Sequence, residues 1–276
     1  MCIVQDSATK HDIIQKMDLI YGKAFATVVT LSGNDASAAL PGIQPHTGRS
    51  QYVEAVGDLV LTPTPLPLSY LLELSKWNTR GWTLQEKLLS RRRLYFTYHY
   101  VYWQCNKGTF AEIGPGTAPE KNVEANKFED LNLYSRLASL TIHVYPHEKN
   151  DHVFSLYADL VRTYTQRSLS FPLDILHAFS GLANVLRGRF GSTFFGGPPS
   201  AGLDRALLWN PVGHTTQGDH NFPTWLWAGW EDSVQYTIDL TCRREKYHFC
   251  EAWSRILSDP LSWRPLYTGN EGRGRC

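Results

Sequence analysis

The sequence lacks features that mark membrane and secreted proteins. No apolar run approaches the roughly 20 residues of a membrane-spanning helix, and the opening MCIVQDSATK lacks the basic-then-apolar order of a signal peptide. The 5 cysteines are odd in number and scattered, unlike a secreted disulfide framework. We therefore expect a cytoplasmic protein with reduced thiols and no membrane span.

An excess of charge and the common nucleotide motifs are also missing. The formal net charge is only +1, which gives no electrostatic reason to expect a nucleic-acid partner. The segment GRFGSTFFGG lacks the Gly-Lys-Ser/Thr ending of a phosphate-binding loop, and no GxGxxG occurs. These absences favour a protein that binds neither nucleic acid nor a nucleotide through these two motifs.

Metal and thiol motifs are incomplete. Cys242, His248 and Cys250 offer only three zinc ligands at an unfamiliar spacing. Cys105 and His99 could pair as thiol and base, but the spacing indicates no acid to orient the histidine. We expect no metal site and no resident cofactor.

What the sequence does contain begins with a helix followed by a strand. Between residues 12 and 24, apolar residues fall at helical spacing, namely Ile13, Met17, Ile20 and Ala24. The β-branched run FATVVTLS, residues 25–32, is short enough for a buried strand. This order predicts an α/β fold with a parallel sheet. Residues 33–50, rich in Gly, Pro, Ser, Asn and Ala, indicate a surface loop.

The next segments predict a helix, a hairpin and a domain boundary. A helix is expected over residues 80–90, and the aromatic runs LYFTY and VYWQC (residues 94–98 and 101–105) suit two strands of a hairpin. The Gly-, Pro- and charge-rich stretch that follows predicts a linker at residues 108–127. It would separate a unit at residues 1–107 from one at residues 128–276.

The second unit is predicted to be mostly helical. Residues 152–164 place their apolar residues on one helical face. Another helix is expected from Ser170 or Phe171, with Pro172 in its first turn. In FPTWLWAGW, residues 222–230, Trp225 and Trp227 alternate as in a strand that packs one face against the helices.

Several segments together resemble the fungal heterokaryon incompatibility (HET) domain family. They occur in the family's order: CIVQDS, MDLIYGKA, WNTRGWTLQEKLLSRRRLYF, VYWQC, and then YTQRSLSFPLDILHAFSGL and FPTWLWAGW. The last two resemble the C-terminal extension of many members. The resemblance identifies residues 1–107 as the C-terminal part of a HET domain and residues 128–276 as that extension.

This resemblance implies a role in non-self recognition during hyphal fusion, with programmed cell death as the outcome. It also implies partners among other HET or receptor-like proteins, and self-association. HET domains are distantly similar to Toll/interleukin-receptor (TIR) domains, which are flavodoxin-like. The resemblance therefore implies a partial flavodoxin-like, TIR-like parallel sheet with helices, followed by a mostly helical region with some β-structure.

The same resemblance makes Glu86 the candidate catalytic residue. Some TIR domains cleave NAD with a helical glutamate, which in plant members lies in a W-C-L-x-E motif; here residues 82–86 read WTLQE. Glu86 would stabilise the positive charge that develops on the ribose, with NAD as substrate and not as cofactor. Trp82 and Gln85 would contact the substrate. The alternative is that Glu86 only complements the dipole at a helix start.

One part of the family pattern is absent. The opening block, Y.ALSY.WG, is not found, and Met1 falls where the strand WIDAL should be ending. The first two strands of a TIR-like sheet would then be lost, together with half of the presumptive site. An inactive truncated paralogue and a non-enzymatic interaction module are thus the alternatives to an enzyme. The neighbours of the lost strands would form an edge prone to association.

Overall fold

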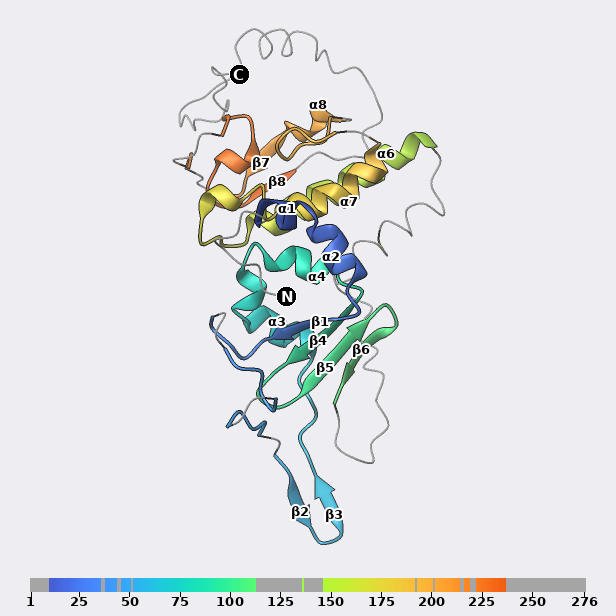
Figure 1. The fold of residues 1–276 in the computed structure, drawn as a ribbon, viewed down its shortest axis with the longest axis vertical. Coiled ribbons are helices and arrows are strands. Elements are labelled where there is room, and N and C mark those ends of the chain that lie inside the picture. The colour runs from blue at the N-terminus through green and yellow to red at the C-terminus, as the bar shows by residue number, and fades with distance from the viewer. Residues whose placement is uncertain are drawn as a thin grey trace, which may run out of the picture.

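The computed structural model describes the greater part of the chain between residues 10 and 236. The described residues are 10–35, 38–43, 46–50, 52–112, 136, 146–191, 193–200, 202–213, 216–218 and 222–236. Figure 1 shows an elongated molecule with a β-sheet in its lower half, helices across its middle and small C-terminal elements above them. Cys242, His248 and Cys250, which the sequence does not predict to bind a metal, lie outside the described residues.

The helix expected at residues 12–24 is present as two short helices. They are α1 (Lys10–Gln15) and α2 (Met17–Lys23), and the backbone leaves helical geometry at Lys16, where φ is −108° and ψ is 14°. The predicted strand follows as β1 (Thr27–Thr30). The helix-then-strand order is confirmed, with a kink that apolar periodicity alone does not show.

The main sheet has four strands in the order β1-β4-β5-β6. The added strands are β4 (Arg92–Phe96), β5 (Val101–Cys105) and β6 (Gly108–Ala111). The β1–β4 pair is parallel because the helical connection between them crosses over, as predicted. The pairs β4–β5 and β5–β6 are antiparallel because short turns join them, so the sheet is mixed. The α/β class and the β4–β5 hairpin are thus confirmed, whereas the expected linker at residues 108–127 begins with a strand.

The two faces of the sheet differ in what covers them. On one face, Val29, Tyr95 and Tyr102 pack against Leu68 and Leu72 of α3 (Leu68–Leu74) in a small buried core. On the other face, strand register aligns one row of side chains across all four strands: Val28, Leu94, Trp103 and Phe110. The members of this row are only partly buried or exposed, and they belong to neither core cluster.

A two-stranded hairpin projects beyond the sheet. It consists of β2 (Glu54–Val56) and β3 (Leu59–Leu61), and all of its strand residues are exposed. Gly57 opens the two-residue turn with φ of 61°, which suits a type II′ hairpin turn. Figure 1 shows the hairpin as a finger at the lower end of the molecule.

Helix α4 (Thr83–Leu89) lies between the sheet and the C-terminal half. It follows the turn η1 (Trp77–Thr79). The remaining elements of the described C-terminal half are α6 (Pro146–Thr165), η3 (Pro172–Asp174), α7 (Ser180–Phe190), α8 (Leu203–Ala206), β7 (Trp209–Pro211), η4 (Trp227–Gly229) and β8 (Val234–Tyr236). The predicted helix at 152–164 is confirmed. The one expected from residue 170 is a 3₁₀ turn, and its helix begins only at Ser180.

The main hydrophobic core joins the two predicted units. Leu84, Leu88 and Leu89 of α4 share one buried cluster with α6 and α7. Within that cluster the indole N–H of Trp227 donates to the hydroxyl of Tyr157 at 3.0 Å, and both rings are fully buried. The predicted domain boundaries stay a prediction, because most of residues 108–127 lie outside the described chain.

The Trp-rich strand expected at residues 222–230 is not a strand. Trp227 begins the 3₁₀ turn η4, whereas Trp230 makes only an isolated bridge with Gln217. The tight turn brings the N–H of Gly229 to the carbonyl of Leu226 at 2.9 Å. The expected packing role is present, since Trp227 is buried in the core.

Helices that could cross a bilayer are absent from the described part of the chain, because none combines the necessary length with enough apolar character.

Candidate functional site

Glu86 lies in α4, where the sequence placed it in a helix. It is in the first turn, partly buried, and faces the junction between α2, η1 and α4. Its neighbours therefore come from α4 itself, from η1 just before it, and from α2, which only tertiary folding brings close.

The Glu86 carboxylate is bound by two aromatic side chains. The indole Nε1–H of Trp77 donates to Oε2 at 3.2 Å. The hydroxyl of Tyr21, from α2, makes a second hydrogen bond to the same carboxyl group. The carboxyl thus links α2 and η1 to α4, as a structural cross-link would.

Burial raises the pKa of the Glu86 carboxyl above its ordinary value. Hydrogen bonds from Trp77 and Tyr21, and the charge of Arg80, act in the opposite direction but do not cancel the rise. Burial and the adjacent Glu86 also raise the pKa of Tyr21, so its hydroxyl stays protonated and can donate. The group therefore keeps its proton to a higher pH than an exposed glutamate does, which is a property of both acid catalysts and buried structural carboxyls.

Gln85, expected to contact substrate, lies in the core with a relative exposure of 0%. Its Oε1 accepts a hydrogen bond from the backbone N–H of Gly181, in α7, at 3.2 Å. Its Nε2 has no hydrogen-bond partner within the described residues. In this position Gln85 contacts protein and not solvent, and its binding role stays a prediction.

Trp82, also expected at the substrate site, precedes α4 and packs against the main core while partly buried. Two surface hollows in the described structure lie elsewhere. One is lined by residues 12–24 of α1 and α2, and the other by residues 52–63 around the hairpin. Neither hollow includes Trp82, Gln85 or Glu86.

Arg167 also contacts the WNTRGWT segment, residues 77–83. Its guanidinium donates to the carbonyl of Arg80 at 3.2 Å, to Oδ1 of Asn78 at 3.1 Å and to Oγ1 of Thr83 at 3.3 Å. The neighbouring Ser168 accepts at its carbonyl from the N–H of Gly81 at 2.8 Å. The YTQRSL and WNTRGWT segments, far apart in sequence, therefore dock on each other.

Sequence reasoning missed Trp77, Tyr21 and Arg167 as partners of this segment. A usable signal was present, because Tyr21 and Trp77 lie in the quoted segments MDLIYGKA and WNTRGWT, and buried Tyr and Trp generally need a hydrogen-bond partner. The pairing of Tyr21 with Glu86, however, depends on the packing of α2 against α4.

Comparison with known proteins gives one positive result. A family model described as heterokaryon incompatibility protein (HET) matches residues 1–86. No curated protein and no solved structure matches the chain. The TIR-like aspect of the fold therefore stays a prediction. Residues 1–86, which end at Glu86, therefore belong to the heterokaryon incompatibility (HET) family.

Proposed function

We propose that this protein is a cytoplasmic effector of heterokaryon incompatibility that acts in non-self recognition and leads to programmed cell death. It would work by assembling with other HET or receptor-like proteins. The match of residues 1–86 to the HET family supports a role in heterokaryon incompatibility. The position of Glu86 supports a mechanism by assembly over one by catalysis.

The preference for assembly over catalysis rests on the surroundings of the Glu86 carboxyl. Its hydrogen bonds to Trp77 and Tyr21 connect three elements, and neither of the two hollows reaches it. A catalytic carboxylate must face the ribose of its substrate. Here Glu86 is instead occupied in holding the signature helix to its neighbours.

The test is controlled overexpression in a filamentous fungus. We expect the wild-type chain and Glu86→Gln to arrest growth equally, because the amide keeps the shape of the side chain and can still accept from Trp77. Arrest that vanishes with Glu86→Gln, while the variant accumulates and folds as the wild type does, would contradict the assembly mechanism.

NAD cleavage by Glu86 is the second candidate. A specific observation favours it, because the aromatic side chains of Trp77 and Tyr21 lie beside this carboxyl. Purified wild-type protein and Glu86→Gln would be compared for NAD loss and nicotinamide release. Equal rates of NAD loss in the two proteins would remove the catalytic assignment of Glu86. Nicotinamide release that is lost in Glu86→Gln would instead favour catalysis over assembly as the mechanism.

A further inference from the structure

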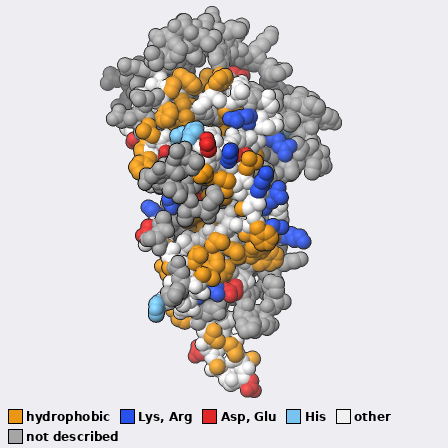
Figure 2. Space-filling model, viewed as in Figure 1, with side chains coloured by type: hydrophobic (Ala, Val, Ile, Leu, Met, Phe, Trp, Pro, Cys, Tyr) orange, Lys and Arg blue, Asp and Glu red, His pale blue; other side chains and the backbone are white. Residues whose placement is uncertain are grey.

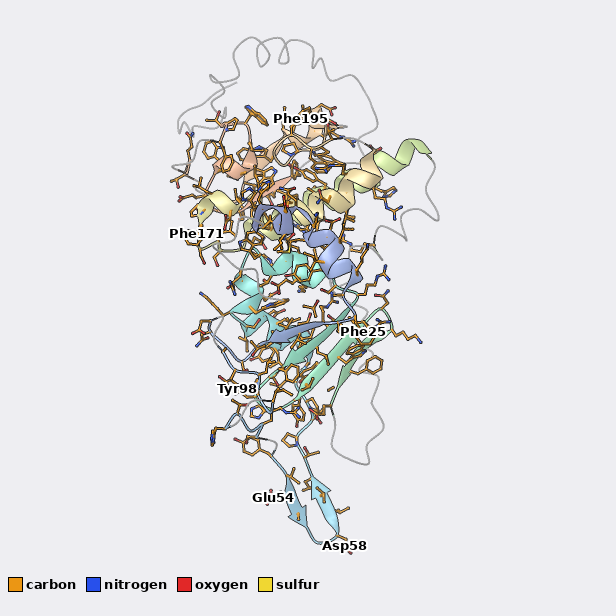
Figure 3. All side chains as sticks on the ribbon, in the orientation of Figure 1. Phe25, Glu54, Asp58, Tyr98, Phe171 and Phe195 are labelled. Atoms are coloured by element: carbon orange, nitrogen blue, oxygen red, sulfur yellow. The ribbon has the colours of Figure 1, made fainter. Side chains whose placement is uncertain are left out.

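The β2–β3 hairpin, residues 52–61, is an exposed apolar projection with acidic charge; we call it the finger. Val56, Leu59, Val60 and Leu61 are each more than half exposed, at 53, 67, 68 and 52%. Its charged residues are Glu54 and Asp58, and it contains no Lys or Arg. Figure 3 shows both acidic residues on the hairpin, well away from the sheet.

The side of the main sheet that belongs to neither core cluster of the described residues is an apolar surface with basic charge at one end; we call it the open face. Its centre is the row Val28, Leu94, Trp103 and Phe110, which register aligns across four strands. Phe25 extends it beyond the start of β1 with an exposure of 77%. Figure 2 shows hydrophobic side chains gathered at the level of the sheet.

Basic residues border one end of the open face. Arg92 belongs to the same face as Leu94, two residues along β4, and its guanidinium lies 4.9 Å from the centre of the Phe25 ring. Lys23 ends α2 just before Phe25, and Lys107 lies in the turn after β5. Both lysines are exposed. In Figure 2, Lys and Arg side chains lie beside the hydrophobic patch.

We propose that the finger of one molecule docks on the open face of a second copy of this chain. Both surfaces are apolar, so contact would remove hydrophobic area from water on each partner. Their charges are opposite, because Glu54 and Asp58 would meet the border formed by Lys23, Arg92 and Lys107. Each molecule carries one finger and one open face.

Charge also decides between this arrangement and symmetric alternatives. Pairing two fingers would bring four acidic side chains together, and pairing the basic ends of two open faces would bring like charges together. Docking of finger on face avoids both. Such an interface is heterologous, so each added molecule leaves one finger and one face free, and assembly is open-ended unless the rotation closes a ring.

This inference deepens the proposed function by naming one partner, a second copy, and it rests on the assembly mechanism proposed there. The finger is small, so the contact belongs among weak interfaces that depend on concentration. Salt should weaken it, because exposed charges are screened over ~10 Å at ~0.1 M.

Sedimentation velocity over a concentration series of the full chain tests the proposal. We expect wild-type protein to associate at low salt. The finger variant Glu54→Lys/Asp58→Lys and the face variant Lys23→Glu/Lys107→Glu should each associate at least ~10-fold more weakly, because like charges then meet. An equimolar mixture of the two variants should regain association, because the native finger of one meets the native face of the other and the reversed finger meets the reversed face with opposite charges again. Each variant still carries one native surface, which matches that of the other.

Glu73→Lys and Lys76→Glu are matched controls, since both residues are exposed but lie outside the finger and the open face. Circular dichroism would verify that all variants fold. Wild-type association of the finger variant would overturn the proposal in favour of face-to-face pairing, and wild-type association of the face variant in favour of finger-to-finger pairing. A wild-type chain that stays monomeric overturns self-docking. Growth arrest by that same monomeric chain would leave the proposed function standing.

Discussion

At the scale of residues, Glu86 is predicted to matter for stability. Glu86→Ala would leave the Trp77 indole N–H and the Tyr21 hydroxyl without their acceptor in a partly buried position. We expect a loss of ~1–2 kcal/mol in the free energy of unfolding, measured by urea denaturation with tryptophan fluorescence. Unchanged stability would show that these hydrogen bonds are replaced by water at no cost.

The raised pKa of Glu86 also predicts a pH dependence of stability. The folded state holds this proton more tightly than the unfolded state, where the pKa is near 4.5. The stabilisation is therefore full below about 4.5 and is lost as the pH rises through the folded-state pKa. Glu86→Gln does not titrate there. The free energy of unfolding of the wild type, relative to this variant, should fall as the pH rises above about 4.5. A difference that grows with pH would reverse the inferred sign.

Residue-level prediction succeeded where the cause was local. The position of Glu86 in the first turn of a helix follows from the residues around it in sequence. The burial of Gln85 against Gly181 does not, because the two lie 96 residues apart and meet only when α7 packs on α4. The same reason kept the contact between Glu86 and Tyr21 out of reach.

At the scale of elements, Gly181 sets how closely α7 approaches α4. A Cβ there would lie 2.4 Å from Gln85 Oε1 and 3.2 Å from Leu89 Cδ1. Gly181→Ala should therefore destabilise the protein by ~1–3 kcal/mol. Gly188→Ala in the same helix meets nothing within 4 Å and should stabilise by ~0.5–1 kcal/mol. Thermal unfolding of both variants provides the measurement. Equal effects would mean that helix propensity, and not packing, decides at both sites.

Arg167 ties two elements together through its three acceptors. Arg167→Ala should cost ~1–3 kcal/mol in the free energy of unfolding, because the carbonyl of Arg80 and the Asn78 side chain lose a charged donor. Arg167→Lys should recover only part of this, since an ammonium lacks the planar fork. Chemical denaturation measures both. Arg162→Ala is the control. Arg162 is exposed and lies 3.6 Å from Asp159, so its removal should change stability by less than ~0.5 kcal/mol.

Helices and strands were predicted best where apolar residues recur at a regular spacing over a long segment, as in α6. The finger was missed although Gly57-Asp58 between apolar residues is a hairpin signal. The strand expected at Trp225 and Trp227 was wrong because alternation over so few residues cannot distinguish a strand from a 3₁₀ turn.

At the scale of the whole molecule, the shared core predicts that the HET segment does not fold alone. A fragment of residues 1–112 would expose Leu84, Leu88 and Leu89, which pack against α6 and α7. We expect this fragment to lack a cooperative thermal transition and to bind a hydrophobic dye, whereas the full chain melts cooperatively. A cooperative transition of the fragment would instead support the predicted boundary at residues 108–127.

The α/β class could be predicted because helix and strand patterns alternate early in the chain. The fourth strand of the sheet could not, since β6 lies in a stretch whose Gly and charge content indicated a linker. Amino-acid composition therefore gave the wrong prediction for β6, because a short strand can form wherever one neighbouring strand, here β5, offers backbone hydrogen bonds.

The separation of 96 positions between Gln85 and Gly181 also affects how the protein is made. At ~5–20 residues per second, a ribosome needs ~5–20 s to synthesise that interval. For the later part of this time the leucines of α4 are outside the ribosome, whereas α7, which packs against them, has not yet been made. Nascent chains would thus expose these hydrophobic side chains to one another and to chaperones. Synonymous codon changes within this interval would change the rate of synthesis, and with it the yield of folded protein, without altering the amino-acid sequence.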